Sequence, residues 1–178
     1  MNDRNKRDLS ISMLRANIVA VIIGVPVAIF QLVSFGILHG AKKMQVTWNI
    51  LLFLALVVAG IVIHELIHGL TWKVFTKKSF SSIKFGFQWK TLTPYAHLIE
   101  PVKVNAYRIG GFMPGLILGI IPYTLSLVLG DGNLLWFGVV HTIAAGGDWL
   151  LLWLLRKEKG GTLVEDHPSR AGCYIIED

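Results

Sequence analysis

The sequence has few charged residues, a single cysteine and no linker-like segment. Asp, Glu, Lys and Arg make up 16% of its 178 residues, whereas 53% are hydrophobic. This composition is too apolar for a soluble domain of such length. One cysteine, Cys173, excludes an intramolecular disulfide. Because no Pro-, Gly- or Ser-rich stretch and no repeat divides the chain, we expect one integral membrane domain over residues 1–178.

The hydrophobic residues are concentrated in four stretches, at residues 16–38, 48–70, 110–129 and 134–155. Each is close to the length of about 20 residues that a helix needs to cross a hydrocarbon core of about 30 Å. The first stretch is too long for a secretory signal and lacks a cleavage site, so we interpret it as a retained helix. The sequence predicts an all-α membrane protein with four transmembrane helices embedded in lipid, followed by a cytoplasmic tail at residues 156–178.

Lys and Arg are distributed unequally between the segments that connect these spans. The N-terminal segment, the connection between the second and third spans and the C-terminal tail hold 15 of the 17 basic residues, and the first connection holds only Lys42 and Lys43. Basic residues accumulate on the cytoplasmic side of membranes, so we expect both termini in the cytoplasm. The membrane also explains the net charge of +6, so no nucleic-acid partner is expected.

The cytoplasmic connection between the second and third spans contains an alternating segment. Between Ile83 and Trp89, apolar residues alternate with polar ones or glycine, which is the two-residue period of a half-buried strand. We expect a short β-strand or hairpin here, with residues 101–104 as the candidate for pairing.

The second span carries the motif His64-Glu65-Leu66-Ile67-His68. Two histidines four residues apart on a helix project from one face and can bind one zinc ion. In H-E-x-x-H motifs the glutamate binds no metal and acts as the general base. Ionisable residues inside a membrane are costly, and such residues are usually functional. The motif predicts one Zn²⁺ per chain, bound by His64 and His68, with Glu65 as the catalytic base.

A third zinc ligand has to come from outside the motif. The candidates are Asp148, Glu100, His97 and His141. At about 1.5 Å per residue, His64 lies about 24 Å from the outer face of the core and Asp148 about 21 Å, whereas His141 lies about 10 Å deep. Depth favours Asp148 and places the site near the cytoplasmic face. Glu100 is kept as the alternative, because its loop can fold back over the site.

The chain resembles a family of small bacterial membrane-embedded zincin metallopeptidases that is distantly similar to site-2 proteases. The resemblance covers about residues 48–157. It is carried by the H-E-x-x-H motif, by residues 94–101 (PYAHLIEP) leading to residues 107–109 (YRI), and by residues 146–149 (GGDW). It implies a bacterial cell membrane, His64, His68 and Asp148 as zinc ligands and Glu65 as the base. It also implies cleavage of a peptide or membrane-protein substrate within or beside the bilayer.

By the same resemblance, an extended substrate would pair with the exposed edge of the strand at residues 83–89. Phe85, Phe87 and the nearby His97 are therefore candidates for substrate binding. His97 also suits a role in stabilising the transition state.

Three functions fit these features. A zinc endopeptidase is favoured because Glu65 is intact. A catalytically inactive metal-binding protein or assembly factor would have the same ligands, and a small transporter subunit would use Asp148, His141 and the third span as an ion path. In that span Gly111, Gly115 and Gly119 recur every four residues, which permits close helix packing or a homodimer.

Overall fold

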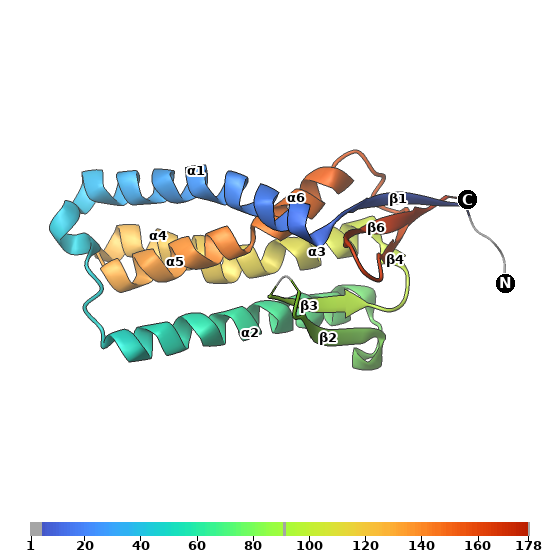
Figure 1. Cartoon of the computed structure of the whole chain (residues 1–178), viewed down its shortest axis with the longest axis horizontal. Helices are drawn as coiled ribbons and strands as arrows, with labels where there is room; N and C mark the ends of the chain where they lie inside the picture. Colours follow the sequence, from blue (N-terminus) through green and yellow to red (C-terminus); the bar gives the residue numbers. More distant parts are fainter. Residues whose placement is uncertain (1–4, 91, 178) are drawn as a thin grey trace.

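The computed structural model describes residues 5–90 and 92–177. This part of the chain is a long bundle of helices with short strands at one end (Figure 1). Three helical segments are long and apolar enough to cross a membrane, namely α1 (Met13–His39), α2 (Ile50–Thr76) and the run Val104–Leu129. A bent pair, α5 (Gly132–Ala144) and α6 (Gly146–Leu155), meets the same criterion when taken together, so the described residues contain up to four spans.

The spans begin where the sequence offers a capping side chain. Ser12, Asn49 and Asp131 accept backbone N–H groups in the first turns of α1, α2 and α5. α1 ends at Gly40 and α4 (Ile121–Leu129) ends at Gly130, where φ is 78° and 66°, values that glycine adopts without steric cost. The first three predicted spans coincide with the three long segments, and the fourth coincides with the bent pair. A short 3₁₀-helix, η1 (Ala41–Met44), follows α1.

The third segment is not a uniform α-helix. It consists of α3 (Val104–Pro114), the π-helix η3 (Gly115–Ile120) and α4 (Ile121–Leu129). Pro114 and Pro122 flank the π-turns, and each removes one backbone donor. The glycine face predicted for this span packs against α5 and α6 of the same chain: a Cβ atom on these glycines would first meet Leu152 (Gly111), Trp149 and Ala145 (Gly115) and Thr142 (Gly119).

Four strands form an antiparallel sheet that joins both termini of the chain. Its order is β1-β6-β5-β4, with β1 (Lys6–Ile11), β6 (Ala171–Ile176), β5 (Leu163–Asp166) and β4 (Val102–Lys103). The prediction of a mostly helical protein is confirmed, but "all-α" is wrong at this end. The predicted tail at residues 156–178 contains β5 and β6, which the hydropathy pattern did not reveal.

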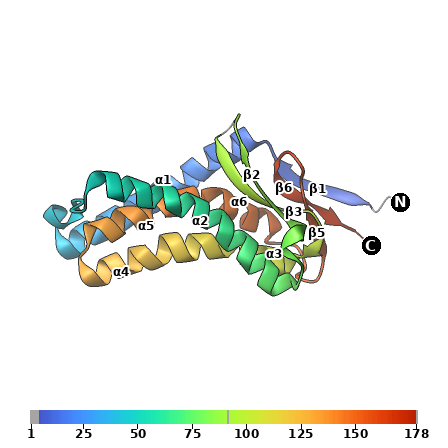
Figure 2. The same ribbon diagram turned by 90° about the horizontal axis from the view of Figure 1, so that it is seen from below.

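A separate hairpin connects α2 to α3. After the short helix η2 (Phe80–Ser82), β2 (Ile83–Gln88) pairs with β3 (Thr93–Leu98), and Phe85 lies opposite Ala96. β2 agrees with the strand predicted at residues 83–89. The predicted pairing with residues 101–104 is wrong, because Val102 in β4 pairs with Val164 in β5. Figure 2 shows the hairpin projecting from the bundle next to the sheet.

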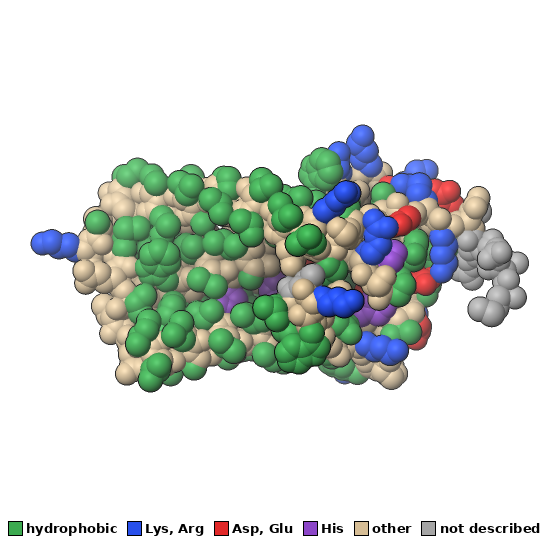
Figure 3. All heavy atoms as spheres, viewed as in Figure 1, with side chains coloured by type: hydrophobic (Ala, Val, Ile, Leu, Met, Phe, Trp, Pro, Cys, Tyr) green, Lys and Arg blue, Asp and Glu red, His purple; other side chains and the backbone are tan. Residues whose placement is uncertain are grey.

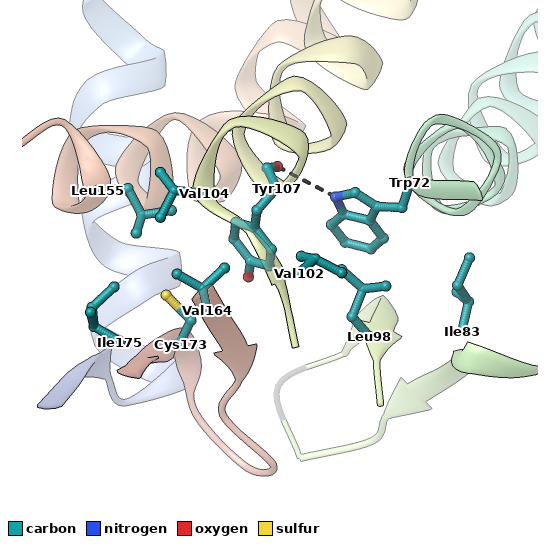
Figure 4. Close-up of a cluster of buried hydrophobic side chains, with 10 residues drawn as sticks. All are labelled: Trp72, Ile83, Leu98, Val102, Val104, Tyr107, Leu155, Val164, Cys173 and Ile175. Carbon is teal, nitrogen blue, oxygen red and sulfur yellow. Dashed lines mark hydrogen bonds between the residues drawn. The ribbon is translucent and has the colours of Figure 1, made fainter. Parts of the chain in front are cut away.

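The strands and the helix ends share one hydrophobic core (Figure 4). The indole N–H of Trp72 on α2 donates to the backbone carbonyl of Tyr107 on α3, at 3.4 Å. Around this pair lie buried residues from β2 to β6, α3 and α6: Ile83, Leu98, Val102, Val104, Leu155, Val164, Cys173 and Ile175. This core fixes the C-terminal half of α2, which carries the H-E-x-x-H motif, against the strands.

The surface divides into an apolar part and a charged part. Hydrophobic side chains cover the helices in Figure 3, and Lys and Arg gather at the end with the strands. Large apolar side chains are exposed on the helices, for example Ile37 (79%), Leu51 (74%) and Val128 (73%). An apolar surface of this extent suits contact with lipid. Histidine side chains are visible between the hydrophobic ones near the middle of this face (Figure 3).

Candidate metal centre

α2 places two histidines on its buried face. His64 and His68 are one helical turn apart, are 7% and 5% exposed, and have ring centroids 4.9 Å apart. The surrounding run of Leu, Ile, Val and Ala is helical because a helix satisfies all backbone hydrogen bonds within one segment, as lipid requires. Both imidazoles therefore face the bundle interior.

α6 brings Asp148 to the same point. Its Oδ2 lies 3.0 Å from Nε2 of His64, and its Oδ1 lies 3.2 Å from Nε2 of His68. The 45° bend between α5 and α6 directly precedes this residue. Gly146 packs against Ala20 of α1, where a Cβ atom would lie 2.7 Å from the Ala20 carbonyl oxygen. This glycine before Asp148 thus lets α6 approach α1.

The three side chains fit a zinc ion. One ligand atom from each lies within 4.8 Å of the others, and this is the one group of three or more such side chains among the described residues. Tetrahedral zinc with bonds of about 2.0–2.1 Å holds neighbouring ligand atoms about 3.3 Å apart. Nε2 of His64 and Nε2 of His68 lie 3.0 and 3.2 Å from different oxygens of the Asp148 carboxylate, so both imidazoles are within reach of an ion that this carboxylate binds. Three protein ligands leave the fourth position for water or substrate.

Contacts behind the ligands fix the orientation of His68. Its Nδ1–H donates to the backbone carbonyl of Gly110 at 2.9 Å, which leaves Nε2 free to bind a metal. The indole of Trp72 stacks on the imidazole, with centroids 5.2 Å apart. Gly110 makes room for that indole, since a Cβ atom there would lie 2.0 Å from Nε1 of Trp72. Nδ1 of His64 is buried and has no hydrogen-bond partner among the described residues.

Glu65 faces a cavity that it shares with the three ligands. The cavity has a volume of about 690 Å³ and reaches from the ligands past β3 to the loop between β5 and β6. The backbone N–H of Ala96 on β3 donates to the Glu65 carboxylate. The predicted general base therefore lies between the metal ligands and the hairpin.

Two of the three predicted substrate-binding residues lie at the cavity, and the third does not. Phe87 and His97 line the cavity, but Phe85 is not among its lining residues. The Phe85 ring lies against α2 instead, where a Cβ atom on Gly69 would meet its Cζ at 2.5 Å. The cavity wall is formed by residues 93–97 of β3 more than by β2, which contributes Lys84, Phe87 and Gln88.

The other candidates for third ligand lie outside the group. Glu100 accepts hydrogen bonds from Lys78 and from Ser82, and these bonds hold the pKa of its carboxyl below the usual range. His141 is fully buried, and its ring occupies the space beside Gly60, one turn before His64. Neither side chain joins His64, His68 and Asp148.

Two residues to which the sequence assigned no role in the site reach the cavity and contact each other. Tyr107 on α3 and Asp166 on β5 both line it, and the Tyr107 hydroxyl donates to Asp166. Burial raises the pKa of Asp166 above its usual range. A strand-like pattern in residues 171–176, AGCYII, could have signalled the sheet that carries Asp166.

A family model described as "Putative zincin peptidase" matches residues 56–163. The chain belongs to this family. The matched segment includes His64, Glu65, His68 and Asp148, so the zincin assignment and the ligand geometry concern the same part of the chain. The predicted resemblance to zincin metallopeptidases is confirmed, and the likeness to site-2 proteases stays a prediction. No curated protein and no solved structure matches the chain.

Proposed function

We propose that the protein is a zinc-dependent endopeptidase of the membrane that hydrolyses a peptide bond within or beside the bilayer. One observation carries the proposal: two histidines of α2 and an aspartate of α6 lie close enough to bind one metal ion, and Glu65 of the histidine motif lines the same cavity. Membership of a zincin family supports the same chemistry.

His64, His68 and Asp148 would hold the zinc. When bound, zinc supplies a Lewis acid that polarises the scissile carbonyl and activates water. Glu65 accepts the proton of the attacking water and later returns it to the leaving amine. The Ala96 N–H keeps the Glu65 carboxylate turned toward the cavity.

The orientation in the membrane follows from the basic residues. We propose four spans, counting α5 and α6 as one bent span, with both termini on the cytoplasmic side. The strands and most Lys and Arg side chains lie at one end of the bundle (Figure 3), and the cavity reaches this end between α1, α2 and the hairpin. A substrate would therefore reach Glu65 near the cytoplasmic face.

The hairpin suggests how a substrate is held. The backbone N–H groups of Ala96 and Leu98 already donate to Glu65 and Asp166, and Pro94 has no N–H. Strand addition would therefore use the outer edge of β2, about 4.8 Å farther from the ligands. We favour docking of an extended substrate against the cavity side of β3, with Phe87 and His97 as side-chain contacts.

Zinc analysis combined with a cleavage assay tests the proposal. Purified wild-type protein should contain one zinc per chain and hydrolyse quenched fluorogenic peptides in detergent micelles. His64→Ala and Asp148→Ala should lose zinc, whereas Glu100→Ala, the matched carboxylate control, should retain it. Glu65→Gln should keep zinc and lose hydrolysis.

Each variant can also contradict the proposal. Normal zinc content in Asp148→Ala would remove the aspartate from the ligand set. Equal hydrolysis by wild type and Glu65→Gln would remove Glu65 as the general base. Zinc binding by wild type without hydrolysis of any peptide would identify a metal-binding protein without peptidase chemistry.

A further inference from the structure

Asp166 is a buried carboxylate on the cavity wall, and the proposed mechanism of hydrolysis assigns it no role. It is 8% exposed and ends β5, three residues beyond the segment that matches the zincin family. Its Oδ2 accepts the backbone N–H of Leu98 at 2.7 Å, and its Oδ1 accepts the Tyr107 hydroxyl. These two bonds fix the carboxylate between β3 and α3.

The third neighbour of Asp166 is His97. Nδ1 of His97 lies 3.5 Å from Oδ2 of Asp166, and this is the ion pair that the described residues give this carboxylate. A buried carboxylate is costly without a cationic partner. An imidazole that faces a carboxylate with Nδ1 directs its Nε2 to the opposite side. Because His97 lines the cavity, a donor at Nε2 is available to a substrate.

His97 is also next to the proposed base along β3. Its neighbour Ala96 donates its N–H to Glu65 on α2, whereas His97 and Leu98 contact Asp166 on β5. Adjacent residues of β3 therefore contact α2 and β5. A series of stacked aromatic side chains connects His68 to Asp166. His68 stacks on Trp72 and Trp72 on Tyr107, with centroids 5.2 and 5.6 Å apart, and Tyr107 bonds to Asp166.

We propose that His97 donates a hydrogen bond from Nε2 to the oxyanion of the tetrahedral intermediate, and that Asp166 is the positioning residue that orients it. This inference rests on the proposed peptidase function. Attack by water forms a C–O bond, moves the carbonyl π electrons to oxygen and transfers one proton to Glu65. His97 keeps its proton while it stabilises the oxyanion. Collapse re-forms the carbonyl, breaks the C–N bond and moves the proton from Glu65 to the amine.

Preorganised donors of this kind contribute substantially to catalysis. Removal of one oxyanion donor typically lowers kcat about 100- to 1000-fold. We therefore expect His97→Ala to lower kcat on a quenched peptide about 100-fold with a much smaller change in KM. His97→Gln, whose amide N–H₂ can occupy the position of Nε2, should recover part of the loss. Asp166→Asn should fall between wild type and His97→Ala.

A binding experiment tests the inference without turnover. The probes are acetohydroxamate, which needs only the metal, and a phosphinic dipeptide, whose tetrahedral phosphorus carries an oxygen at the oxyanion position. With zinc-loaded protein, His97→Ala should weaken binding of the phosphinic dipeptide at least tenfold and leave hydroxamate binding within about threefold of wild type. Lys84→Ala is the matched control, because Lys84 lies opposite His97 in the hairpin and lines the same cavity.

The outcomes separate the two proposals. Wild type and His97→Ala could both bind zinc and hydroxamate and have equal affinity for the phosphinic dipeptide. That result would overturn the role of His97 and leave the proposed peptidase function standing. Equal losses in His97→Ala and Lys84→Ala would overturn the role of His97 as well. If wild type binds neither zinc nor hydroxamate, the peptidase function fails and this inference fails with it. His97 is partly exposed, so its variants test the inference even if Asp166→Asn does not fold.

Discussion

Substitution of Gly110 by alanine should lower the stability and the zinc affinity of the protein, although Gly110 is not one of the proposed ligands. A Cβ atom at Gly110 would lie 2.0, 2.3 and 2.7 Å from three atoms of the Trp72 indole. That indole is 4% exposed and lies between the rings of His68 and Tyr107, so it has no free space into which to move. Relief of the clash therefore has to displace His68 or separate α2 from α3.

The magnitude follows from two opposing effects. Overpacking of this kind costs about 1–3 kcal/mol, whereas replacing glycine by alanine inside a helix gains about 0.5–1 kcal/mol. The net loss of stability should therefore be at most about 2.5 kcal/mol. The carbonyl of Gly110 also holds Nδ1 of His68, and loss of such a contact behind a ligand typically lowers metal affinity about 10- to 100-fold.

Gly111→Ala is the matched control. It gains the same helix propensity, and its Cβ would meet Leu152 at an ordinary 3.6 Å. Thermal unfolding in detergent and zinc competition with a chelator should show losses for Gly110→Ala and none for Gly111→Ala. Adding Trp72→Phe to Gly110→Ala should restore part of the zinc affinity, because the smaller ring relieves the clash. If the two alanine variants bind zinc equally well, the stacked arrangement does not support His68.

Three further predictions use other parts of the chain. Removal of zinc by a chelator should lower the unfolding temperature in detergent, since zinc at 1,000 times its Kd contributes about 4 kcal/mol; an unchanged temperature would argue against a bound metal. Burial raises the pKa of the Cys173 thiol to about 12, so N-ethylmaleimide at pH 8 should label it only after denaturation, and rapid labelling of native protein would contradict its place in the core. Gly60→Ala should destabilise the bundle by about 1–3 kcal/mol, because its Cβ would lie 2.1 Å from Nε2 of His141; His141→Ala in the same chain should offset this loss, and additive effects would contradict the contact.

The spans and the ligand pair could be predicted because their signals are local. A run of about 20 apolar residues marks a span, and the spacing of His64 and His68 marks one helix face. Counting residues from the outer face also selected the carboxylate that lies beside both imidazoles in the structure, Asp148. That count worked because two helices that cross the same layer keep a common scale of 1.5 Å per residue.

The sheet could not be predicted in the same way. Lys6 pairs with Ile176, and the pattern of a single segment does not indicate a partner so distant in sequence. β4 has two residues, too few for any alternation to be seen. The hairpin partner was wrong for a different reason. Pro94 is the second residue of β3 and lies opposite Phe87, whereas proline in a sequence usually argues against a strand.

The alternating pattern of β2 predicted a strand, but it did not predict which element each side chain contacts. Phe85 and Phe87 are two residues apart and share one side of β2, so the pattern treats them as equivalent. The structure gives them different neighbours, α2 at Gly69 for Phe85 and the cavity for Phe87. A period of two specifies a face of a strand, but the element that covers each part of that face depends on tertiary packing.

The same distinction explains how the metal centre is assembled. α2 supplies His64, Glu65 and His68, together with the Trp72 indole that stacks on His68. The other groups that orient these side chains come from distant segments. Asp148 depends on the bend between α5 and α6, and the contacts of β3 with Asp166 depend on β5, which β6 and β1 hold in place. The two chain termini therefore contribute to the geometry of a site near the middle of the sequence. The sequence indicates the ligand pair and suggests His97 as a stabilising residue, whereas the contact between His97 and Asp166 becomes visible only when the sheet is formed.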